Sequence, residues 1–302
     1  MPLIILILIA VAVTAALFII LSAIIANIIV HGYRQEPDEA WNWQMQHAPG
    51  CRVFHREDFT DYLVTAPDGY VHHVSYLPAK EESDRYVILA HGYTDMRWGA
   101  LKYIQFYHAL GFHCIAFDQR GHGENAPQPC SYSIREKTSI LAVLKDARER
   151  FGQDIRVGFH GESLGGATVL AALGEKPDIS FAVDDCGFCE ILPILKAGLK
   201  KAHLPGWMVY PASAMAKLMF GASFTAARPI DAVRDNRIPL LIMHGADDDF
   251  IPPQHSANVK NATAGYSEIH FFEGAGHAAS AIKDPEKYHE ILGTFLREIG
   301  FM

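Results

Sequence analysis

Hydrophobic positions divide this chain into a long apolar run and a series of shorter, alternating segments. From residue 2 to residue 30 no side chain is charged, and only Thr14, Ser22 and Asn27 are polar. Beyond residue 53, apolar runs of strand length alternate with segments whose apolar residues repeat at helical spacing. Such alternation predicts a mostly parallel sheet with helices on both faces, in the α/β class.

The alternation locates eight strands and at least five helices. Strands are predicted near residues 53–64, 71–76, 85–90, 112–117, 155–160, 180–184, 238–243 and 267–272, the first of them forming an antiparallel edge. Helices are predicted near residues 98–110, 135–151, 163–174, 253–263 and 284–299. Residues 190–232 interrupt the alternation with two further helical patterns, at 191–202 and 211–220.

The N-terminal run predicts a transmembrane anchor over residues 1–31. Residues 2–30 would rise about 43 Å as a helix, compared with a bilayer hydrocarbon core of about 30 Å. No basic residue precedes the run, which disfavours a cleaved signal peptide, and its uniform apolarity disfavours a core helix. We therefore expect a single-pass protein of the cell membrane that contacts the bilayer through residues 2–30. Arg34 is the only nearby basic residue, so the side of the membrane stays open.

Residues 32–54 form a polar, aromatic-rich juxtamembrane segment. Trp41 and Trp43 stand in a short helical pattern that starts at Pro37. Amphipathic rings of this kind often lie at the level of the lipid headgroups. Contact with the folded domain explains them equally well, so both interpretations remain open.

Composition narrows the range of partners and cofactors. The 302 residues carry a net charge of −8 without a basic run, which argues against a nucleic-acid partner. Five cysteines do not make a disulfide framework, and the lone Cys186-x-x-Cys189 lacks further ligands at zinc spacing. The sequence contains neither a P-loop nor a dinucleotide fingerprint, so we predict no cofactor and no metal.

The most informative motif is Gly161-Glu162-Ser163-Leu164-Gly165. It follows a predicted strand and precedes a helix rich in small residues, which is the setting of a nucleophile elbow. Two further candidates, Asp248 and His277, each follow a later predicted strand. The chain order of serine, aspartate and histidine is the one that an α/β-hydrolase requires.

With these residues the chain resembles the α/β-hydrolase superfamily. Further matches are the His91-Gly92-Tyr93 loop, the segment from Asp118 to Gly123, and Ala66-Pro67-Asp68-Gly69 before an alternating strand. The resemblance covers roughly residues 55–300. Within the superfamily, the chain is most similar to the membrane-anchored bacterial esterase and serine-aminopeptidase-like group. The resemblance implies an eight-stranded hydrolase domain over residues 55–302 with a small helical cap at about 190–232.

The resemblance also implies a role for each site residue. Ser163 would be the nucleophile, His277 the general base and Asp248 the acid that orients it, while the backbone N–H groups of Tyr93 and Leu164 would form the oxyanion hole. Other positions for the acid stay open, namely Asp247, Asp249, Asp184 and Asp185. Glu162 is expected to contact solvent or the cap, and His91 and His122 are expected to be structural.

These residues predict a serine hydrolase that cleaves carboxylic esters through an acyl-enzyme. Peptidase, amidase or thioesterase activity could use the same three residues. A non-catalytic, membrane-tethered module is the alternative from a different class, because a fold does not determine a function. The substrate is expected to be a small-molecule acyl ester or amide, and its acyl chain length and the oligomeric state stay open.

Overall fold

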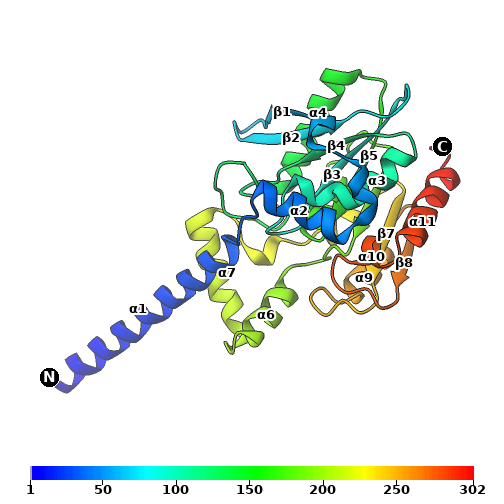
Figure 1. The fold of residues 1–302 in the computed structure, drawn as a ribbon. Helices are drawn as coiled ribbons and strands as arrows, with labels where there is room; N and C mark the ends of the chain where they lie inside the picture. The colour runs from blue at the N-terminus through cyan, green and yellow to red at the C-terminus, as the bar shows by residue number, and fades with distance from the viewer. Residues whose placement is uncertain (1) are drawn as a thin grey trace.

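The computed structural model describes residues 2–302 and centres on one eight-stranded sheet (Figure 1). The strand order is β1-β2-β4-β3-β5-β6-β7-β8; β2 runs antiparallel to both of its neighbours, and every other neighbouring pair is parallel. This confirms the predicted architecture. The strands are β1 (Thr60–Thr65), β2 (Val71–Leu77), β3 (Arg85–Ala90), β4 (His113–Phe117), β5 (Arg156–Glu162), β6 (Phe181–Asp185), β7 (Leu240–Gly245) and β8 (Ser267–Phe272).

Helices cover both faces of the sheet and bury an apolar core on each. One face carries α2 (Pro37–His47), α3 (Leu101–Ala109), α10 (Ser280–Lys283) and α11 (Pro285–Glu298). The other carries α4 (Glu136–Phe151), α5 (Leu164–Leu173), α8 (Ile230–Val233) and α9 (Gln254–Ala262). Because the central strands are buried on both sides, most of each strand is an apolar run rather than an alternating pattern, and polar residues such as Glu162, Asp185 and His244 lie toward the carboxyl ends.

The first predicted strand was placed too early. Residues 49–58 form two short 3-10 helices, η1 (Pro49–Val53) and η2 (Arg56–Asp58), and β1 begins only at Thr60. The Asp58 side chain accepts a hydrogen bond from the backbone N–H of His55 at 2.7 Å, which holds a turn where the apolar pattern indicated a strand. The predicted helix at 98–110 similarly begins with a 3-10 helix, η3 (Arg97–Ala100).

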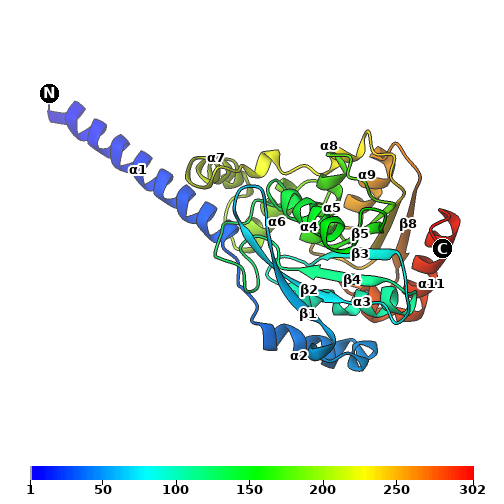
Figure 2. The same ribbon diagram turned by 90° about the horizontal axis from the view of Figure 1, so that it is seen from above.

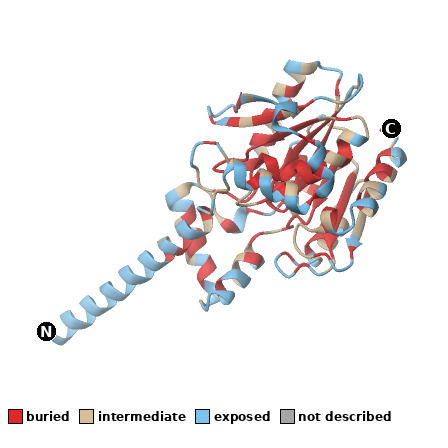
Figure 3. Cartoon of the chain, viewed as in Figure 1, coloured by how far each residue is buried: buried red, intermediate tan, exposed pale blue. Residues whose placement is uncertain are grey.

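The N-terminal helix α1 (Pro2–Val30) extends away from the domain as a long, straight rod (Figures 1 and 2). It is long and apolar enough to cross a membrane. Residues 2–21 are exposed, whereas Ser22, Ile25, Ala26 and Val30 are buried, as the red end of the helix in Figure 3 shows. Apart from Phe18, which stacks on Trp207, the first two thirds of the helix are therefore free of the domain.

The end of α1 packs on the inserted segment between β6 and β7. This segment contains α6 (Leu192–Lys201), η4 (Gly206–Met208), α7 (Val209–Phe220) and η5 (Phe224–Ala226). Residues of α1, α6 and α7 share one apolar cluster that also includes Leu164, directly after the elbow serine. The segment thus lies over the carboxyl end of the sheet, and we call it the cap.

The segment after α1 is attached to the domain. Trp41 on α2 packs edge-on against Trp98 and Phe59, with ring centroids 5.1 and 6.2 Å apart. The Arg34 guanidinium donates hydrogen bonds to the backbone carbonyls of Gly123 and Asn125. Trp41 therefore contacts the folded domain, which is the second of the two interpretations of this segment.

Candidate active site

Ser163 lies in the sharp turn between β5 and α5. Its backbone adopts φ 54° and ψ −111°, a conformation that residues other than glycine rarely take. A Cβ on Gly161 would come within 2.1 Å of the Gly165 carbonyl oxygen, and one on Gly165 within 2.0 Å of the Ala90 carbonyl oxygen. Both positions therefore require glycine, and the turn lifts the serine above the end of the sheet.

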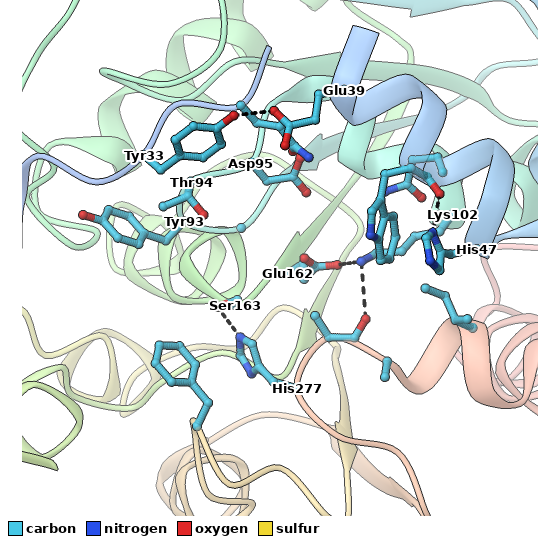
Figure 4. A pocket seen from close by; sticks show the side chains of 18 residues that line it. Tyr33, Glu39, His47, Tyr93, Thr94, Asp95, Lys102, Glu162, Ser163 and His277 are labelled. Carbon is cyan, nitrogen blue, oxygen red and sulfur yellow. Dashed lines mark hydrogen bonds and ion pairs between the residues drawn. The ribbon is translucent and has the colours of Figure 1, made fainter. Parts of the chain in front are cut away.

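The structure brings Ser163, His277 and Asp248 together in one hydrogen-bonded chain. Ser163 Oγ lies 2.9 Å from His277 Nε2, as the dashed line in Figure 4 marks. On the other side of the ring, His277 Nδ1 lies 2.7 Å from Asp248 Oδ2. With Nδ1 protonated and bonded to the carboxylate, Nε2 is left free to accept the serine proton.

Asp248 is buried and fully hydrogen-bonded. Its Oδ1 accepts the backbone N–H groups of Phe250 and Ile251 at 2.9 and 2.8 Å. Burial alone would raise the pKa of Asp248, but hydrogen bonds from His244 and His277 outweigh it and hold that pKa below its ordinary value. The Asp248 carboxylate is therefore negatively charged while it orients the His277 imidazole.

The other acid candidates do not contact His277. Asp247 and Asp249 are exposed. Asp184 Oδ1 accepts the backbone N–H of Gly187 at 3.1 Å, and Asp185 Oδ2 accepts the Tyr288 hydroxyl at 2.9 Å. Of the five aspartates considered, the geometry places only Asp248 on the imidazole.

Both candidate oxyanion donors lie beside the serine. Leu164 is the first residue of α5, where a backbone N–H has no partner within the helix. A Cβ on Gly92, which precedes Tyr93, would lie 3.7 Å from Ser163 Cβ, so this loop runs against the nucleophile. The Tyr93 side chain has a separate contact, because its hydroxyl donates to the Ile29 carbonyl of α1 at 2.9 Å.

Two features of the site were not predicted. His244 lies behind Asp248, with Nε2 at 3.1 Å from Asp248 Oδ2 and 2.8 Å from the Ile251 carbonyl, while Nδ1 contacts the Ser256 hydroxyl at 2.6 Å. Its position four residues before Asp248, in His244-Gly245-Ala246-Asp247-Asp248, was the available signal. It contacts the same carboxylate oxygen as His277 and so helps to hold the acid in place.

The second feature corrects the expectation for Glu162. This side chain is buried, where contact with solvent or the cap was expected. It forms an ion pair with Lys102 at 2.5 Å and accepts the Tyr103 hydroxyl at 2.6 Å (Figure 4). Glu162 and Lys102 line a cavity of about 770 Å³ that reaches Ser163 and His277.

The histidines and cysteines around the site have structural contacts. His91 accepts the backbone N–H of Gln119 at 2.9 Å, and His122 contacts the Arg120 carbonyl at 2.7 Å. Cys186 lies close to Asp248 and His277, with one potential ligand atom of each within 4.8 Å of the others. Burial raises the pKa of the Cys186 thiol well above its ordinary value, and the two partners already bond to each other. The trio is therefore poorly suited to hold a metal.

Comparison with known proteins identifies the family of the chain. Residues 87–291 match the profile of the alpha/beta hydrolase family. The chain belongs to this family. Among its relatives is the uncharacterized protein YqkD of Bacillus subtilis, 26% identical over 247 residues that cover 80% of this chain and 81% of YqkD.

Solved structures of other alpha/beta hydrolases have the same fold. The Pyrococcus furiosus esterase Pf2001 superposes with a TM-score of 0.66 at 21% identity, covering 81% of this chain and 96% of the esterase. An acylaminoacyl peptidase of Pyrococcus horikoshii gives a TM-score of 0.61 at 14% identity, covering 79% of this chain and 41% of the peptidase. At these identities the likeness establishes the fold, and both names describe the other proteins.

Proposed function

We propose that this alpha/beta hydrolase is a serine esterase. The observation that carries the proposal is the unbroken chain from Ser163 Oγ through His277 to Asp248, with 2.9 and 2.7 Å between successive polar atoms. A serine hydroxyl needs a base within hydrogen-bond reach, and the base needs a third group to orient it. The arrangement meets both requirements.

The reaction would proceed in two halves. In the first, Ser163 Oγ bonds to the carbonyl carbon while His277 Nε2 takes the hydroxyl proton, and the resulting oxyanion accepts the N–H groups of Leu164 and Tyr93. The imidazolium then gives its proton to the departing alcohol, which leaves the acyl group on the serine. In the second half, water gives a proton to His277 and attacks the acyl carbon. The imidazolium then returns that proton to Ser163 Oγ as the bond between Oγ and the acyl carbon breaks, which releases the acid and restores Ser163.

The apolar character of the cap suits an apolar acyl group, such as that of a carboxylic ester. Peptidase, amidase and thioesterase activities remain the alternatives, since the same groups perform them. A non-catalytic module is disfavoured because all three reacting side chains are present and mutually bonded. Attachment to a membrane through α1 is part of the proposal, and the buried residues at the end of that helix argue against its removal as a signal sequence.

The test uses the full chain in detergent or lipid nanodiscs, with Ser163→Ala and, as a control, Ser223→Ala in the cap. We expect fluorophosphonate labelling and hydrolysis of p-nitrophenyl esters in the wild type and in Ser223→Ala. Ser163→Ala should lose both, with a rate reduced by about 10⁴-fold or more. Cleavage of aminoacyl amides without ester turnover would replace the esterase proposal by the peptidase alternative. Absence of labelling and turnover in a folded protein would favour the non-catalytic module.

A further inference from the structure

The end of the membrane helix forms a wall of a second cavity that also reaches the nucleophile. This cavity, of about 630 Å³, is lined by Ile25, Ile28 and Ile29 of α1 and by Ser163 and Leu164 at its inner end. The cap helix α6 supplies the facing wall, with Ile194, Leu195, Gly198 and Leu199. Its size falls within the range of small-molecule sites, and its walls are almost entirely aliphatic and aromatic.

We propose, on the basis of the esterase function above, that the substrate is a single-chain lipid ester of a small uncharged alcohol, taken from the membrane. Its acyl chain would occupy the cavity between α1 and α6, and its alcohol would occupy the cavity beside Glu162. The membrane helix is then part of the substrate site as well as an anchor.

The contacts of α1 hold it firmly as a cavity wall. The Tyr93 and Tyr132 hydroxyls both donate to the Ile29 carbonyl, at 2.9 and 2.6 Å. The backbone N–H of Cys130 donates to the Val30 carbonyl at 2.9 Å. Carbonyls in the last turn of a helix lack partners within the helix, so these donors fix the end of α1 to the domain. Tyr93 thereby joins the candidate oxyanion loop to the membrane helix.

The nucleophile lies where the two cavities meet. Five residues line both of them: Tyr33, Tyr93, Thr94, Ser163 and Phe250. An ester whose carbonyl carbon is at Ser163 therefore extends its acyl chain into one cavity and its alcohol into the other.

The side chains that line the cavity beside Glu162 determine which alcohol fits there. Lys102 is paired with Glu162 at 2.5 Å, which leaves Glu39 as a further acidic group in the lining, together with Asp95, whose pKa burial raises to about 7. An anionic headgroup would meet repulsion there, whereas hydroxyl groups would find both donors and acceptors. A glycerol-like alcohol fits this lining.

The geometry also places the apolar cavity at the membrane surface. Residues 2–21 of α1, which are exposed, rise about 30 Å, the thickness of a hydrocarbon core. Ile25 follows within about one turn. The cap exposes Trp207, Tyr210, Leu218 and Met219, and Trp207 stacks on Phe18 of α1 at 6.0 Å. Ile28 and Gly198, both exposed, line the cavity from opposite sides, so it opens between α1 and α6.

The test narrows the apolar cavity without touching the catalytic groups. Gly198→Phe places a ring where a Cβ meets no atom within 4 Å, and Ala197→Phe adds the same ring at the neighbouring exposed position, which does not line the cavity. Full-length proteins in nanodiscs would be assayed with monooleoylglycerol and with p-nitrophenyl acetate. We expect Gly198→Phe to lower kcat/KM for monooleoylglycerol by about tenfold, equivalent to displacing about two methylenes, and to leave acetate hydrolysis within about twofold. Ala197→Phe should change neither.

A second pair tests the contribution of α1 and guards against misfolding of the cap variant. Ile28→Trp should impair monooleoylglycerol selectively, whereas Ile24→Trp, one turn earlier and outside the lining, should not. Equal loss with both substrates, or unchanged lipid hydrolysis in both cavity variants, would overturn the inference and leave the esterase intact. Faster hydrolysis of an anionic lysophosphatidate would overturn the assignment of the alcohol. Loss of acetate turnover and labelling in the wild type would instead refute the proposed function.

Discussion

Ser163 keeps a backbone conformation that costs about 1–3 kcal/mol for a residue with a side chain. The surrounding structure compensates for it, because the Ser163 backbone N–H donates to the Asp185 carbonyl at 2.8 Å and the Ala167 N–H donates to the Ser163 carbonyl at 3.0 Å. The strained turn is therefore held by β6 on one side and by α5 on the other, which fixes the hydroxyl relative to His277.

Asp184, beneath this turn, leads to a prediction about pH. Burial raises the pKa of Asp184 to about 7, and one of its oxygens has no hydrogen-bond partner among the described residues. Between pH 4 and pH 7 the unfolded chain binds fewer protons at this group than the folded one, so stability falls as pH rises. Asp184→Asn removes the titration. We expect the melting temperature of Asp184→Asn, relative to that of the wild type, to rise between pH 4 and pH 8. The rise should be about 2–4 °C for each kcal/mol of folding stability that the wild type loses over this range.

Thermal unfolding of both proteins in the same detergent at several pH values checks this. The conservative variant preserves the acceptor for the Gly187 N–H. Asp247→Asn, at an exposed position next to the site, is the control and should show no such trend. A melting-temperature difference that stays constant with pH would contradict the burial of a protonated carboxyl group.

Sequence reasoning placed Ser163, Asp248 and His277 correctly relative to the strands because each follows a recognisable apolar run. It failed for Glu162, whose partner Lys102 stands sixty residues earlier and reaches it only through the fold. The hydrogen bond from the Tyr93 hydroxyl to α1 was missed for the same reason, because it also joins segments that are distant in the sequence. Pairings between distant segments, unlike strand ends, leave no local pattern.

At the scale of elements, the strands were predicted well where both faces are buried, since a continuous apolar run then marks the whole strand. The edge of the sheet was predicted less well, because turn-forming polar contacts at residues 49–58 interrupt the pattern. The helix over residues 2–30 was predicted at nearly its full length. Its apolar residues are uniform, however, so nothing in the sequence distinguishes the turns that contact the cap from those that do not.

This division of α1 predicts different results for two truncations. Deleting residues 2–21 removes only exposed turns and should leave the cap folded. Deleting residues 2–31 also removes the buried Ile25, Ala26 and Val30, and it leaves the Tyr93 and Tyr132 hydroxyls without their acceptor. Burying one aliphatic side chain contributes about 1.5–3 kcal/mol, so we expect the longer deletion to destabilise the cap by several kcal/mol.

Limited proteolysis distinguishes the two truncated proteins. Cleavage within residues 190–232 should accelerate strongly in the longer deletion and stay near the full-length rate in the shorter one. Melting curves in matched detergent provide a second measure. Equal protease resistance of both truncations would mean that α1 does not support the cap.

On the scale of the whole molecule, α1, the cap and the candidate nucleophile form one continuous arrangement. The apolar cluster that contains the end of α1 also contains Leu164, which neighbours Ser163. The exposed apolar side chains of the cap lie on η4 and α7. Helix α7 runs beside the end of α1, the helix that would cross the bilayer (Figure 2). With α1 across a bilayer, as proposed above, both features would orient the domain with its cap toward the lipid.

This orientation predicts which tryptophan meets the membrane. Trp207 is 56% exposed and stacks on Phe18, in the exposed part of α1, so its ring should lie among lipid chains. Trp43 stacks on His47 and lines the cavity beside Glu162, away from those chains. In vesicles of brominated phospholipid, the bromine atoms should quench part of the protein fluorescence. Trp207→Phe should remove most of that quenched part, whereas Trp43→Phe should leave it. Loss of the quenched part in Trp43→Phe instead would place the juxtamembrane helix, rather than the cap, on the bilayer.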